Sequence, residues 1–64
     1  MGYKIKECRE EMKMTQEELS RKSGVSRATI WALEKGIKRT TTTMTLIKIA
    51  QALGKSVNEI FFAQ

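Results

Sequence analysis

The stretch from Thr15 to Gly36, TQEELSRKSGVSRATIWALEKG, constrains the fold of this chain more than any other. Thr15 and Glu18 have the spacing of a capping box at the start of a first helix, and Ser26 can cap a second. Gly24 and Gly36 follow these helices, where glycine readily adopts the left-handed conformation that ends a helix. Helix, glycine turn and capped helix together are the sequence form of a helix-turn-helix.

The rest of the chain also shows helical periodicity. Apolar side chains recur three and four residues apart over 3–12, and a fourth helix is expected to run from a cap at Thr42 to Leu53. Ser56 and Glu59 form a second capping box that opens a last short helix. The threonine run before the fourth helix disfavours helix because its side chains are β-branched. We therefore predict an all-α, five-helix fold in a single domain spanning 1–64.

The side chains available exclude most chemistry. The chain has 64 residues, one cysteine and no histidine. Cys8 lies on the inner stripe of the first helix and is interpreted as a small buried residue rather than a reactive thiol. Four metal ligands, or a nucleophile beside a base, cannot be assembled from what remains. We expect no catalytic activity, no metal and no cofactor.

The charge balance favours an anionic partner. Twelve Lys and Arg against seven Asp and Glu give a net charge of +5, typical of a nucleic-acid binder. No apolar run approaches ~18 residues, and no apolar stretch follows a basic N-terminus. We expect neither a membrane span nor a signal peptide, and place the protein in the cytoplasm.

The second helix of the pair has an unusual outward face. At about 100° per residue, Ile30, Leu33 and Glu34 fall on the inner side. The outward side carries two cations, two small residues and one tryptophan: Arg27, Ala28, Trp31, Ala32 and Lys35. A large aromatic side chain is normally buried, so Trp31 either lies near a nucleic acid, packs within the chain or contacts a protein.

Such a helix fits the major groove of DNA. Arg27 can donate two hydrogen bonds to guanine, Ala28 and Ala32 can contact thymine methyl groups, and Trp31 can contact sugars or thymine methyls. Arg27 and the loop cations are otherwise solvated. Contacts to the DNA backbone are assigned to polar and cationic residues at the helix starts and beyond the end of the second helix: Gln16, Ser26, Lys35, Lys38, Arg39 and Thr40.

The stretch 14–36 resembles the Cro/CI-type, XRE-like helix-turn-helix family of phage and bacterial transcriptional repressors. The similarity continues through TLIKIAQALG at 45–54 and SVNEIF at 56–61. The resemblance implies a lambda-repressor-like domain that binds DNA through its third helix, usually as a two-fold dimer on a partly palindromic operator. It also implies a salt bridge between Arg9 and Glu34, and it gives Gln16 a phosphate contact.

We predict a homodimeric, repressor-type regulator that binds double-stranded DNA sequence-specifically, with helix 27–35 in the major groove. Phe62 follows Phe61, which is expected in the core, so Phe62 points elsewhere and is assigned to the dimer interface or to a frayed end. Two other functions stay open: an antitoxin or controller that also binds a protein partner, and a protein-interaction module that no longer binds DNA. Arg27 and Lys35 favour DNA, whereas Trp31 suits any of the three.

Overall fold

The computed structural model describes residues 3–37 and 41–62, the last of these by its backbone only. Every regular element in this part of the chain is helical, which confirms the predicted all-α fold. The elements are α1 (Ile5–Glu11), α2 (Gln16–Ser23), α3 (Arg27–Lys35), α4 (Thr43–Leu53) and η1 (Asn58–Phe62). The last element is a short π-helical turn, and α1 is shorter than the predicted 3–12.

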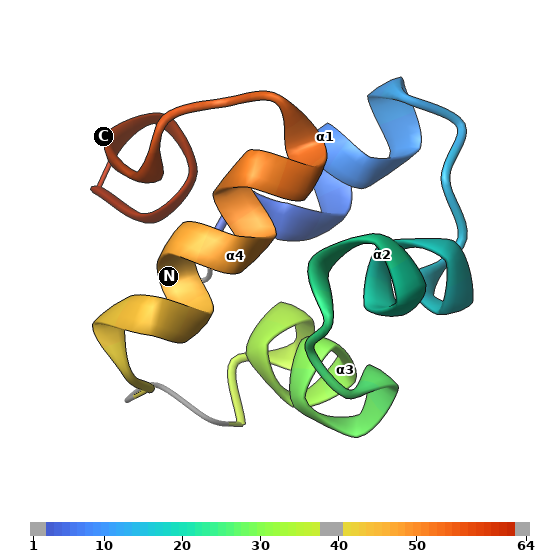
Figure 1. The fold of residues 1–64 in the computed structure, drawn as a ribbon, viewed down its shortest axis with the longest axis horizontal. Coiled ribbons are helices and arrows are strands. Elements are labelled where there is room, and N and C mark those ends of the chain that lie inside the picture. Colours follow the sequence, from blue (N-terminus) through green and yellow to red (C-terminus); the bar gives the residue numbers. More distant parts are fainter. Residues whose placement is uncertain (1–2, 38–40, 63–64) are drawn as a thin grey trace.

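The helices pack around α4, which crosses the middle of the molecule in Figure 1. It contacts α2 and α1, while α3 packs against α2 and α1. In this view η1 lies across the molecule from α2 and α3 (Figure 1). The helix-turn-helix is therefore one side of a small unit measuring 24 × 20 × 19 Å along its principal axes.

One aliphatic core joins all five elements. Its fully buried large side chains are Ile5, Leu19, Ile30, Leu33, Ile49, Leu53 and Ile60. Cys8 belongs to the same core, and burial raises the pKa of its thiol, as expected of a packing residue. The two ends of the core are tied together, because the Lys4 N–H donates to the Ile60 carbonyl at 3.0 Å and the ring of Tyr3 meets that of Phe61 edge-on.

The predicted caps are confirmed. The hydroxyls of Thr15, Ser26 and Thr42 each accept the backbone N–H three residues on, and Glu18 completes its capping box by accepting the Thr15 N–H at 2.8 Å. Gly24 adopts φ +77°, which turns the chain sharply between α2 and α3. Helix α1 ends early because Lys13, at φ +54°, reverses the chain before α2. The longest helix described, α4, has 11 residues, and none in the described ranges is long and apolar enough to cross a bilayer.

Candidate nucleic-acid interface

Two serines fix the turn between α2 and α3. The Ser20 hydroxyl donates to the Val25 carbonyl at 2.7 Å, and the Val25 N–H donates to the Ser23 hydroxyl at 3.1 Å. Both backbone polar groups of the buried Val25 are thereby satisfied where no helix can satisfy them. Sequence analysis did not predict these bonds, although two serines flanking a turn glycine are a recognisable signal for them. They fix the angle at which α3 leaves α2.

Helix α3 presents the face that the sequence predicts. Ile30 and Leu33 are fully buried, whereas Arg27, Ala28 and Lys35 are exposed and Trp31 retains 45% of its exposure. Ala32 is half-buried beside them. Arg27 forms no hydrogen bond or ion pair with another described residue, so its guanidinium donors are available to a ligand.

The structure brings one residue of α2 beside this face. Gln16, Arg27, Ala28 and Trp31 line one open hollow of about 580 Å³. Three of these four were predicted to read bases and the fourth, Gln16, to contact phosphate. The hollow combines a free cation, an amide and an apolar wall, which is a suitable mixture for the edges of base pairs.

A hydrogen-bonded network below the hollow holds Gln16. The Arg9 Nε donates to Glu34 Oε2 at 2.9 Å, and the Arg9 Nη2 donates to Glu34 Oε1 at 3.2 Å. The Gln16 amide also donates to Glu34 Oε1, at 3.0 Å, and the Arg9 Nη1 donates to the Met14 carbonyl at 2.8 Å. One bidentate ion pair therefore ties together α1, the α1–α2 link, α2 and α3.

This network is shielded from solvent. The side chains of Arg9 and Glu34 are 12% and 4% exposed. The hydrogen bond to Glu34 is the main cause that raises the pKa of Arg9. The resemblance implied the ion pair, but the Gln16 contact was not predicted. A carboxylate only accepts hydrogen bonds, so the nitrogen of the Gln16 amide must face Glu34, and one N–H of that amide remains for another partner.

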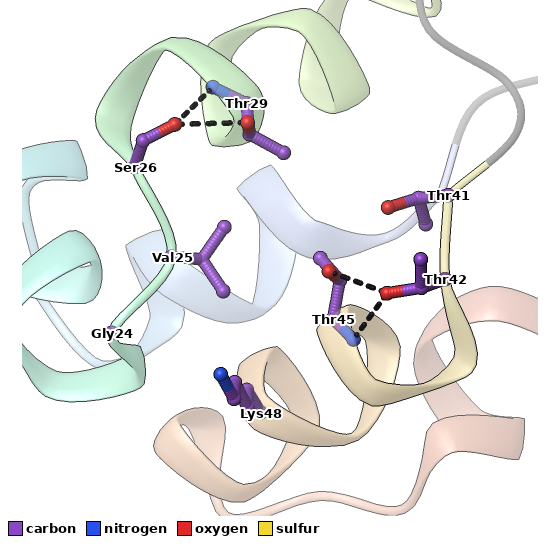
Figure 2. A pocket seen from close by; sticks show the side chains of 8 residues that line it. All are labelled: Gly24, Val25, Ser26, Thr29, Thr41, Thr42, Thr45 and Lys48. Carbon is purple, nitrogen blue, oxygen red and sulfur yellow. Dashed lines mark hydrogen bonds between the residues drawn. The ribbon is translucent and has the colours of Figure 1, made fainter.

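A second hollow, of about 590 Å³, lies between the helix-turn-helix turn and the start of α4 (Figure 2). It is lined by the turn and by hydroxyls from both sides, with one lysine: Gly24, Val25, Ser26, Thr29, Thr41, Thr42, Thr45 and Lys48. The Ser26 hydroxyl accepts the Thr29 N–H and donates to Thr29 Oγ1 at 2.9 Å (Figure 2). Ser26, predicted to contact the DNA backbone, thus already uses its hydroxyl hydrogen within α3. Lys48 was not among the predicted site residues.

Four predicted site residues cannot be placed. Lys38, Arg39 and Thr40 lie outside the described residues, as does the side chain of Phe62. The backbone of Phe62 ends η1, across the molecule from α3 in Figure 1. Their assignments to DNA backbone and dimer interface stay predictions.

The sequence profile of one protein family, described as helix-turn-helix, matches residues 5–60, which include α1 to α4 and reach into η1. The chain belongs to the XRE-like helix-turn-helix family. It is 45% identical over 58 residues to an uncharacterized HTH-type transcriptional regulator of Methanothermobacter thermautotrophicus, covering 89% of this chain and 83% of the relative.

Two further relatives carry the same description. A regulator from Archaeoglobus fulgidus is 43% identical over 61 residues, covering 95% of this chain and 84% of the relative. Another from Methanocaldococcus jannaschii is also 43% identical over 61 residues, covering 95% and 91%. No solved structure matches the chain. These similarities place the hollow around Arg27 in the helix-turn-helix of a known family.

Proposed function

We propose that this helix-turn-helix protein is a transcriptional regulator that binds double-stranded DNA sequence-specifically by inserting α3 into the major groove. Membership of a DNA-binding regulator family supports the general activity. The observation that carries the specific proposal is the exposed face of α3, where an unpaired Arg27 and a half-exposed Trp31 line one hollow with Gln16.

The major groove is wide enough to admit a helix, and the first residues of a recognition helix reach the base edges. Arg27 is the first residue of α3, and Ala28 follows it. Trp31 and Ala32 lie one turn further along the helix. Arg27, Ala28, Trp31 and Ala32 are therefore the base-reading residues of the proposal.

The remaining polar residues bind the phosphate backbone and set the register of α3 on the duplex. Gln16 is the first residue of α2, and one N–H of its amide is free beside the positive end of that helix. Lys35 closes α3. Ser26, Lys38, Arg39 and Thr40 complete the proposed set of backbone contacts.

We further propose that the protein acts as a homodimer and represses by occupying its operator. A single α3 offers four base-reading residues, too few for high affinity at one site. Two copies related by a two-fold axis place their α3 helices in successive major grooves about 34 Å apart. A partly palindromic operator follows from that symmetry, and Phe62 is the proposed dimer contact.

Selection from a pool of random duplexes tests the proposal directly. We expect recovered sequences to share two inverted half-sites about one helical turn apart. Affinity for the selected duplex should fall steeply as salt rises, because each phosphate contact releases counterions. A salt-independent affinity, or no enriched sequence, would contradict DNA binding.

Two variants separate the roles on α3. Arg27→Ala should relax base preference at one position in each half-site. Lys35→Ala, the matched control at the other end of the same helix, should weaken all sequences alike and lower the salt slope by about 0.9 per site. Sedimentation of the wild type and of Phe62→Ala tests the dimer, and an unchanged mass for the variant would reject Phe62 as the contact.

A further inference from the structure

The hollow beside α3 has a chemistry that specifies more than DNA in general. Resting on the DNA binding proposed above, we propose that each α3 reads a guanine next to a 5-methylpyrimidine, which is a thymine or a 5-methylcytosine. Arg27 supplies the donors for the guanine, and Ala28 with Trp31 supplies the apolar wall for the methyl group.

Arg27 fits the guanine because nothing in the described structure competes for it. It is exposed, and it bonds to no described residue. The carboxylate of α3, Glu34, is 4% exposed and already accepts hydrogen bonds from Arg9 and Gln16. Guanine displays two adjacent acceptors, O6 and N7, in the major groove, and a guanidinium fork can donate to both.

The wall next to Arg27 is apolar. Ala28 and Trp31 line the same hollow, and Trp31 is 45% exposed in a chain whose other large core side chains are covered. Adenine and cytosine present polar amino groups in the major groove, which a methyl group and an indole face cannot satisfy. The 5-methyl group of a pyrimidine is the apolar feature that the groove offers, so it matches this wall.

The helix geometry places the methyl group one base from the guanine. At 1.5 Å rise per residue, Ala28 and Trp31 follow Arg27 along the axis by about 1.5 and 6 Å, and a group seated between them is about 4 Å from Arg27. Successive bases of one strand are about 3.4 Å apart. With α3 lying along the groove, the two contacts therefore fall on neighbouring bases.

The fourth wall of the hollow is fixed in place. The Gln16 nitrogen is 3.0 Å from Glu34 Oε1, and the Arg9 ion pair fixes that carboxylate. The hollow is thus a preformed surface, and the methyl group should be read without rearrangement of α2 against α3.

The test uses the full-length protein and a duplex selected from a random pool. We expect each selected half-site to contain a thymine beside a guanine. Replacing that thymine by deoxyuridine removes only the methyl group and should weaken binding about fourfold per half-site, from about 0.8 kcal/mol for one buried methyl. In duplexes with cytosine at that position, 5-methylcytosine should bind more tightly than cytosine. The affinities for thymine and 5-methylcytosine then show which source is preferred.

Two variants locate the effect. Trp31→Ala should bring the ratio of thymine to deoxyuridine affinities close to one, whereas Lys35→Ala should weaken both duplexes and leave the ratio near four. Equal affinity of the wild type for thymine and deoxyuridine, equal affinity for cytosine and 5-methylcytosine, or a Trp31→Ala ratio still near four would overturn the proposal. Failure of DNA binding itself would appear separately, as the absence of any enriched sequence.

Discussion

Replacing Glu34 by alanine leaves the Arg9 guanidinium without its carboxylate, in a setting where the Arg9 side chain is 12% exposed. Breaking a buried ion pair by removing one partner costs about 3–5 kcal/mol, because the remaining charge is desolvated and unpaired. We expect a loss near the lower end, about 3 kcal/mol, since Arg9 keeps some contact with solvent and its hydrogen bond to the Met14 carbonyl. Domains are stable by about 0.05–0.15 kcal/mol per residue, or roughly 3–10 kcal/mol at 64 residues. The variant should therefore be close to unfolded.

Other variants at this pair should follow a definite order. Glu34→Gln keeps one acceptor oxygen and loses one charge-assisted bond, so it should cost about 1.5–3 kcal/mol. Arg9→Met should cost at least as much as Glu34→Ala, because it strands both the Glu34 carboxylate and the Met14 carbonyl. The double variant Arg9→Met with Glu34→Leu removes both charges together and should recover at least about 2 kcal/mol relative to Arg9→Met alone.

Urea unfolding followed by circular dichroism measures these free energies, and thermal melts should show about 4–8 °C for each kcal/mol lost. Lys35→Ala is the matched control, because Lys35 is the exposed neighbour of Glu34 and should change stability by less than about 0.5 kcal/mol. The reasoning is refuted if Glu34→Ala lies within that same range. It is also refuted if the double variant is no more stable than Arg9→Met.

Three further predictions concern the helix ends. Gly24→Ala should cost about 1–2 kcal/mol through its φ of +77° alone, since a Cβ there would meet nothing within 4 Å, and a melting temperature equal to the wild type would show that the turn relaxes. Thr15→Ala should cost about 1 kcal/mol in urea unfolding by removing the cap of α2, and no change would mean that water replaces it. Backbone N–H groups lower the pKa of Glu18 and Glu59 in the folded state, so both stabilise the fold above the ordinary glutamate pKa of about 4.3, and this is lost as pH falls through the lowered values. The difference in urea midpoint between pH 6 and pH 3 should therefore shrink in Glu18→Gln, and an unchanged difference would contradict this origin.

The helix boundaries could be predicted because their signals are local. Capping at Thr15, Ser26 and Thr42 depends on the residue three positions on, and the left-handed Gly24 depends on the chain turning there. The inward stripe of α3 follows from its 100° period. These features involve short stretches of chain, so a single sequence contains the information needed for them.

The contacts between elements could not be predicted in the same way. The Gln16 to Glu34 hydrogen bond joins α2 to α3 and exists only at the angle that the turn sets between them. The position of Lys48 beside that turn depends in the same way on how α4 packs against α2. Residue type and spacing do not contain these angles. The resemblance to a family supplied the Arg9 ion pair, which no periodicity indicated.

The placement of Glu34 also explains how a helix with an acidic residue can present a positive face. Glu34 is the carboxylate of α3, and a carboxylate on the outward side would neutralise Arg27 and repel phosphates. Its inward position, four residues after the buried Ile30, places it where Arg9 can balance its charge. The same contact that stabilises the helix-turn-helix thereby leaves Arg27 and Lys35 unopposed on the exposed side. Moving the carboxylate outward, by Trp31→Glu in the wild-type background, should therefore abolish DNA binding while the Arg9 ion pair and the fold are retained.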